Sequence, residues 1–123
     1  MDHDADPSTT SPEVFIVLDA VDVDTVAAFW AEAMRYQRVD RLEQYVVLVP
    51  PGNSGPIFLV QGVSEPKHVK NRMHLDLHVT DPEDEAQRLV ALGAQRVGAG
   101  ALGEITWICM RDPEGNEFDI GKR

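Results

Sequence analysis

The chain has 123 residues, which fits one domain, and 43% of them are hydrophobic, which is enough for a buried core. The formal net charge of −10 argues against nucleic acid as a partner, because phosphate binding needs a positive surface. The single cysteine, Cys109, excludes an intrachain disulfide and favours a reducing compartment, and no apolar run approaches the roughly 20 residues of a membrane span. We therefore expect a cytoplasmic protein without a nucleic-acid or membrane partner.

The first half of the chain predicts one strand, one helix and three more strands. Residues 1–12 have no basic region and no apolar segment, so they are interpreted as a disordered tail and not as a secretory signal. Residues 14–21 are apolar and β-branched, which predicts a mostly buried strand. Asp22 then offers a helix cap, and apolar side chains recur at helical spacing over residues 23–34. Strands are predicted at residues 36–41, 44–49 and 57–61, with turns at 42–43 and 50–55.

The second half restarts the same order after a polar linker at residues 63–72. Residues 73–79 alternate strictly between apolar and polar side chains, which predicts a strand with one buried face. Asp81 and Pro82 are typical of a helix start, and Gly93 is typical of a helix end. Short strands are predicted at 95–97, 104–110 and 117–121, with a flexible glycine loop at 98–103 and a turn at 112–116.

An internal repeat relates the two halves. Asp22 and Asp81 each open a helix after an apolar strand, and they are 59 residues apart. At the same offset Phe15 corresponds to His74. We therefore predict an α+β domain over residues 13–123, built from two strand-helix-strand-strand-strand modules at 13–62 and 73–123.

The residues of the second module resemble a known superfamily. NRMHLDLHVTDPEDEAQRLVALGAQRV followed by TWICMRDPEGNEFDI is similar to the second module of glyoxalase, bleomycin-resistance and dioxygenase proteins (the vicinal oxygen chelate superfamily). FWAEAM resembles the first helix of that superfamily. The resemblance implies two tandem βαβββ modules that form a curved mixed sheet, with helices on the outer face and a ligand or metal in the inner cup.

Strand alternation divides the side chains between these two faces. The side chains expected to face the helices are Ile16, Leu18, Ala20, Leu75, Leu77, Val79, Phe118 and Ile120. His74 and Asp119 are the candidate catalytic pair in the cup. The other candidate ligand-binding residues are Phe15, Val17, Asp19, Gln61, Asp76, His78, Trp107, Cys109 and Glu117.

The resemblance also implies metal ligands at the first and last strands of each module. Phe15 occupies the first of these positions and has no lone pair to donate, whereas His74 and Asp119 are suitable ligands. Either Leu59 or Gln61 occupies the fourth position, so Gln61 is a weak third ligand. Because a catalytic divalent site usually has three protein ligands, we expect a metal-free cup. If Zn, Fe, Mn or Ni does bind, we expect it at His74, Asp119 and Gln61.

Two aromatic or thiol side chains near the end of the chain each have two interpretations. Trp107 either packs in the core or stacks on a flat ligand in the cup. Cys109 shares the strand face of Trp107, and a small buried hydrophobe is favoured over a nucleophile. Gly98, Gly100 and Gly103 precede no Gly-Lys-Ser/Thr sequence, so they do not indicate a phosphate loop.

Three functions follow from these patterns. The favoured one is a homodimeric binding protein that holds a small aromatic or amphipathic molecule, such as an antibiotic or other natural product, without a metal. The alternative is a lyase, isomerase or dioxygenase that uses a divalent metal, or acid–base catalysis by His74 and Asp119. The third is a structural or regulatory module whose cup is filled by its own side chains.

Overall fold

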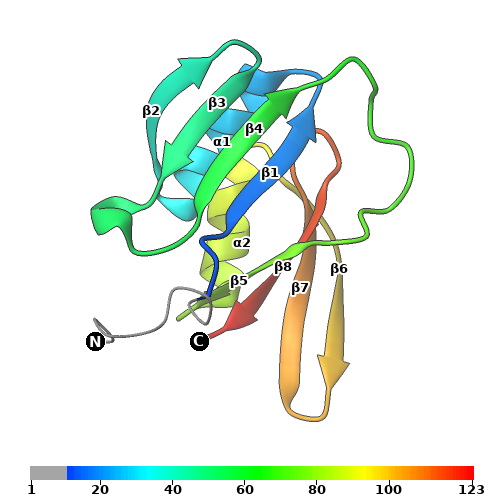
Figure 1. Ribbon diagram of the computed structural model, residues 1–123. Helices are drawn as coiled ribbons and strands as arrows, with labels where there is room; N and C mark the ends of the chain where they lie inside the picture. The colour runs from blue at the N-terminus through cyan, green and yellow to red at the C-terminus, as the bar shows by residue number, and fades with distance from the viewer. Residues whose placement is uncertain (1–10) are drawn as a thin grey trace.

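The computed structural model describes residues 11–123, so the predicted disordered tail lies almost entirely outside the described residues. The first module contains β1 (Phe15–Ala20), α1 (Val23–Met34), β2 (Gln37–Leu42), β3 (Tyr45–Val49) and β4 (Ile57–Gly62), with a short 3-10 turn at Pro51–Asn53 (Figure 1). The second module contains β5 (Leu75–Val79), α2 (Pro82–Ala91), β6 (Gln95–Leu102), β7 (Ile105–Arg111) and β8 (Glu117–Lys122). The predicted order of tandem βαβββ modules is therefore confirmed.

Each module forms a four-stranded mixed sheet, and the two sheets have equivalent strand orders, β1-β4-β3-β2 and β5-β8-β7-β6. The first strand of each module pairs in parallel with the last strand, and the other pairings are antiparallel. The second strand is irregular in both modules, with a register shift between Arg38 and Asp40 and between Arg96 and Gly98. The repeat seen in the sequence is thus a repeat of pairing as well as of element order.

Aspartate caps begin both helices. The side chain of Asp22 accepts a hydrogen bond from the backbone N–H of Thr25 at 3.2 Å, and that of Asp81 accepts one from Asp84 at 3.1 Å. Helix α1 ends at Arg35 in the left-handed conformation, and Gly93 follows α2 with a φ of 116°. Among residues 11–123, neither helix reaches the length and apolarity that crossing a lipid bilayer would require.

One hydrophobic core joins the two modules. Figure 1 shows α1 behind the first sheet, with α2 next to it. The ring of Trp30 on α1 lies 5.7 Å from that of Phe58 on β4 and 5.0 Å from that of Phe118 on β8, so one side chain packs against both sheets. The guanidinium of Arg88 on α2 donates to two backbone carbonyls at the end of α1, which links the helices. All the side chains expected on the helix side are buried in this core or packed against it.

The prediction of a flexible glycine loop at residues 98–103 is wrong, and so is the predicted end of the preceding strand at Val97. Strand β6 continues to Leu102, and only Gly103, with a φ of 62°, lies in the turn. Gly100 pairs with Trp107, and a β-carbon on Gly100 would lie 2.3–2.4 Å from three atoms of the indole ring. The glycine therefore marks a close approach of a neighbouring side chain and not a break in the strand.

The turn before β8 connects the two modules through Asp112, which is 3% exposed. Its carboxylate accepts four hydrogen bonds of 2.9 Å, from the indole N–H of Trp30, the backbone N–H groups of Glu114 and Asn116, and the side-chain amide of Asn116. The carboxylate of Glu114 accepts from the backbone N–H groups of Val21 and Asp22, at the start of α1. The turn thus satisfies donors in both modules at once.

Replacement of Asp112 by Ala should destabilise the protein by about 3 kcal/mol or more, because it leaves several buried donors without an acceptor. Urea unfolding followed by circular dichroism measures this loss. The stability of Asp112→Asn should lie between those of Asp112→Ala and the wild type. An amide keeps one acceptor oxygen, but its NH2 group would face an N–H donor that now has no acceptor. Exposed Glu104 provides the control, and Glu104→Ala should change the free energy of unfolding by less than about 0.5 kcal/mol. Equal effects of Asp112→Ala and Glu104→Ala would contradict the assigned role.

Candidate functional site

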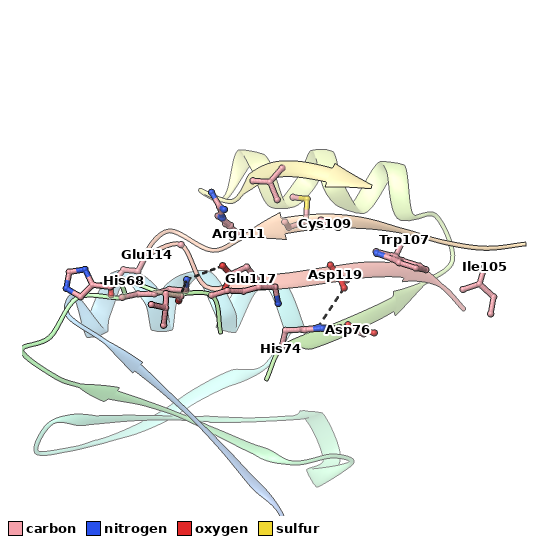
Figure 2. Close-up of a pocket in the computed structure, with 16 residues that line it drawn as sticks. His68, His74, Asp76, Ile105, Trp107, Cys109, Arg111, Glu114, Glu117 and Asp119 are labelled. Atoms are coloured by element: carbon pink, nitrogen blue, oxygen red, sulfur yellow. Dashed lines mark hydrogen bonds and ion pairs between the residues drawn. The ribbon is translucent and has the colours of Figure 1, made fainter. Parts of the chain in front are cut away.

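A groove of about 1030 Å³ lies on the second sheet. Side chains of β5, β7 and β8 form its floor, on the face opposite buried Ile108 and Met110, and part of the segment between β4 and β5 forms its wall. Figure 2 shows Trp107 and Ile105 at one end of this groove, His74, Asp76 and Asp119 in the middle, and His68 and Arg111 toward the other end. We call it the module-two groove.

Three groups converge in the middle of the module-two groove. Nδ1 of His74 lies 3.0 Å from Oδ1 of Asp76 and 3.8 Å from Oδ2 of Asp119. Asp76 and Asp119 are direct partners in the parallel pairing of β5 with β8, and His74 immediately precedes β5. Strand pairing therefore places an imidazole between two carboxylates, with the side chain of Asp119 the least exposed of the three at 22%.

The structure gathers some of the predicted site residues and separates others. Those that line the module-two groove are His74, Asp76, Trp107, Cys109, Glu117 and Asp119. Phe15 and Val17 line an adjacent apolar hollow of about 540 Å³, which His74 and Glu117 also border. Asp19 lies in a further shallow hollow next to the segment between β4 and β5.

Two other predicted residues lie away from the centre of the groove. His78 borders a smaller hollow on the far side of Trp107, and its Nδ1 is 3.4 Å from the carbonyl oxygen of Lys122. Gln61 lies on β4 opposite Asp19 and does not line the module-two groove.

The pairing of β1 with β4 identifies the first-module equivalents of the central groups. Val17 pairs with Leu59 as Asp76 pairs with Asp119, so Leu59 corresponds to Asp119. Phe15 corresponds to His74 by the repeat. Both equivalents in the first module are therefore apolar, and the imidazole and the carboxylate at these positions occur only in the second module.

Glu117 joins the floor of the groove to its wall. The carboxylate accepts a 2.9 Å hydrogen bond from the backbone N–H of Asn71 and a 3.1 Å bond from the ammonium of Lys67. Burial by itself would raise the pKa of Glu117, but these hydrogen bonds outweigh it and lower the pKa to about 2. Glu117 thus stays ionised and holds the segment between β4 and β5 against β8.

Cys109 lies between Trp107 and Arg111 on the same face of β7 and is partly buried. Burial raises the pKa of the Cys109 thiol, and the nearby carboxylate of Asp119 raises it further. The charge of Lys70 acts in the opposite direction and is the smaller effect. The thiol is therefore neutral near pH 7, which fits a packing role better than that of a nucleophile.

Sequence reasoning missed the basic side chains that line the groove. Lys67 and Lys70 come from the segment treated as a linker, and Arg111 ends β7. A signal for the first two was present, because basic residues are scarce in a chain of net charge −10 and three of them fall within residues 67–72. Neither Lys70 nor Arg111 forms an ion pair with any residue in the part of the chain that the structure describes.

The central cluster fits a divalent metal only in part. The donor atoms of His74, Asp76 and Asp119 all lie within 4.8 Å of one another, and one imidazole with two carboxylates suits Mn, Fe or Zn. Asp76 and His74 are exposed, however, and all three donors come from the second module. If an ion binds here, it polarises a ligand oxygen while these three side chains hold it.

The paired βαβββ modules and the groove on the second sheet define the class of this protein as a vicinal oxygen chelate fold. The chain belongs to the glyoxalase-like domain family, whose model matches residues 15–121. No curated protein matches it at a significant level.

Solved structures share the fold at low sequence identity. A glyoxalase-related enzyme from Fulvimarina pelagi is 20% identical with a TM-score of 0.72, over 93% of this chain and 89% of that one. The fosfomycin resistance protein FosX from Listeria monocytogenes is 13% identical with a TM-score of 0.75, over 94% and 95%. Lactoylglutathione lyase from Agrobacterium tumefaciens is 21% identical with a TM-score of 0.65, over 91% and 95%. A FosX variant was solved with Mn(II) and 1S,2S-dihydroxypropylphosphonic acid.

The hydrogen bonds of Glu117 predict a pH-dependent contribution to stability. Since the folded pKa is about 2 and the ordinary value is 4.5, the contribution is complete above about pH 5 and is lost as the pH falls toward 2. The free energy of unfolding of the wild type should exceed that of Glu117→Gln by on the order of 2 kcal/mol at pH 7, and the two values should converge near pH 2. Urea unfolding from pH 7 to pH 2 measures the difference. A difference independent of pH would show that the carboxylate charge is not responsible.

Proposed function

We propose that this protein binds a small aromatic or amphipathic molecule in the module-two groove without a metal, in the manner of glyoxalase-like proteins that sequester antibiotics or other natural products. The observation that carries the proposal is the composition of the groove. Trp107, Ile105 and Val97 supply apolar surface, and charged groups lie along the same floor. Most ligand sites combine an apolar lining with a few placed polar groups in this way.

The first module supports a metal-free site. Phe15 and Leu59 occupy the positions that correspond to His74 and Asp119, and neither side chain can ligate a metal. The apolar hollow lined by Phe15 and Val17 adjoins the module-two groove, and the two hollows share His74 and Glu117. A ligand that extends from one hollow to the other would contact apolar surface in both.

A homodimer belongs to the same proposal. The side chains of Phe15, Val17 and Leu42 lie on the face of the first sheet that does not contact α1, and they are 46–55% exposed. Contact with a second copy would remove these side chains from water and would enclose the open groove. Sedimentation velocity should give twice the mass of the chain, and Phe15→Asp should shift the equilibrium toward the monomer.

Binding is tested by thermal-shift screening and equilibrium dialysis against aromatic natural products. For a ligand found in this way, Trp107→Ala should weaken binding about tenfold, because the ring contact is lost. Val90→Ala, on the exposed side of α2, should leave binding unchanged. The proposal fails if a broad library yields no ligand, or if both variants bind as the wild type does.

The second candidate function is a divalent-metal-dependent lyase, isomerase or dioxygenase, and the convergence of His74, Asp76 and Asp119 favours it. Elemental analysis of untagged protein, with titration of Mn(II) and Zn(II) by calorimetry, distinguishes it from metal-free binding. If this function holds, His74→Ala should abolish a stoichiometric signal and Asp76→Asn should weaken it. Gln61→Leu should have no effect, because strand pairing places Leu59, and not Gln61, at the position that corresponds to Asp119. Absence of a stoichiometric metal in the wild type would remove this candidate.

A further inference from the structure

The indole of Trp107 packs directly on the backbone of Gly100 at one end of the module-two groove. The ring lies across Gly100 of β6, where Cε2, Cζ2 and Nε1 occupy the place that a side chain at Gly100 would take. A β-carbon at position 100 would overlap the ring, so the indole could not keep its present position. The ring borders both the module-two groove and the smaller hollow beside His78, so it is accessible from two sides. This arrangement presents a planar surface whose position depends on one glycine.

The opposite end of the groove is basic. Arg111 lies four residues beyond Trp107 on the same face of β7, and about 3.3 Å per residue separates them by about 13 Å. The carboxylate of Glu117, which is paired with Arg111 across the strands, is already bonded to Lys67 and Asn71. The guanidinium of Arg111 and the ammonium of Lys70 therefore remain available, and their only partner in the described chain is a 3.5 Å contact from Lys70 to the carbonyl oxygen of Asn71.

The acidic groups of the groove determine which end an anionic group of a ligand would occupy. Asp76 and Asp119 flank His74 between the two ends, so a negative group would be repelled from the middle. Glu114, near the basic end, is bonded to the backbone N–H groups of Val21 and Asp22. These bonds hold the Glu114 carboxylate toward the start of α1. Lys67 is paired with Glu117. Lys70 and Arg111 are therefore the lysine and arginine side chains of the groove that have no ion-pair partner among the described residues, and an anionic group would be most favourable beside them.

From this distribution we infer that the ligand is an elongated aromatic anion, with its planar ring on Trp107 and its negative group at Lys70 and Arg111. The inference rests on the proposed binding function and adds the charge, the length and the orientation of the ligand. A carboxylate, sulfonate or phosphonate on a ring system of about 10–13 Å matches the spacing of the two ends. Because the net charge of −10 repels anions elsewhere on the surface, the attraction of an anionic ligand would come from these two local cations.

Two fluorescent probes that differ in one group test this inference. 6-(p-Toluidino)naphthalene-2-sulfonate is elongated and carries a sulfonate at one end, and N-(p-tolyl)-2-naphthylamine has the same rings without the sulfonate. At low ionic strength the sulfonate should bind several-fold more tightly, and added salt should remove the difference. Arg111→Gln and Lys70→Gln should each raise the Kd of the sulfonate about fivefold and leave that of the neutral probe unchanged. Arg72→Gln makes the same charge change in the same segment outside the groove and should affect neither probe.

The packing of Trp107 on Gly100 is tested with matched glycine variants. Gly100→Ala should displace the indole and raise the Kd of both probes about tenfold, whereas Gly98→Ala, where a β-carbon meets nothing within 4 Å, should not. Acrylamide quenching of tryptophan emission in the absence of ligand reports the exposure of the Trp107 ring. Trp30 is buried, and the emission that disappears in Trp107→Phe identifies the contribution of Trp107. Near-wild-type melting temperatures would show that the variants remain folded.

The outcomes separate this inference from the proposed function. Equal affinity for the two probes, with no effect of Arg111→Gln or Lys70→Gln, would overturn the inference and leave aromatic binding intact. Unchanged quenching in Gly100→Ala would show that Gly100 does not determine the position of the Trp107 ring. If neither probe bound the folded protein, the inference would be rejected, whereas the aromatic-binding function would fail only if the natural-product screen also yielded no ligand.

Discussion

The acceptor capacity of one buried carboxylate, that of Asp112, is the constraint on which the arrangement of the two modules depends. Each module has its own sheet and helix, and no strand pairing joins β1 to β5 among the described residues. The connection is made by packing around Trp30 and by the hydrogen bond from its indole N–H to Asp112. A charge is tolerated there because four donors surround it, and the same donors fix the turn that leads into β8. Core packing and the position of the groove floor are therefore coupled.

Duplication of the module has produced two sheets with the same pairing and different surfaces. The first presents Phe15, Val17 and Leu59 where the second presents His74, Asp76 and Asp119. The backbone places these side chains equivalently, so the difference is one of side-chain chemistry alone. The proposal of an amphipathic ligand rests on this difference between the two modules.

Much of the fold could be predicted because it depends on interactions between residues that are close in sequence. The caps at Asp22 and Asp81, the alternation over residues 73–79 and the turn at residues 112–116 each depend on neighbours in sequence. The sequence predicts a short strand at residues 95–97 but not its continuation to Leu102, because glycines are typical of loops and the reason for Gly100 is Trp107 on another strand. The choice between Leu59 and Gln61 needed the pairing of β1 with β4, since the loops of the two modules differ in length. The basic wall at Lys67 and Lys70 lies in a segment without periodicity, so its direction was not encoded locally.

The turn that anchors Trp30 ends at Asn116, and Glu117 follows it directly as the first residue of β8. Scaffold and binding surface therefore meet at one peptide bond. Substitutions within the turn would alter folding and recognition together, which restricts how this part of the chain can change. Trp107 and Cys109 lie outside the turn and make no hydrogen bond to Asp112, whereas Arg111 precedes Asp112 directly. Divergence toward a new ligand is thus directed onto strand β7, where a side chain can be exchanged while the architecture persists.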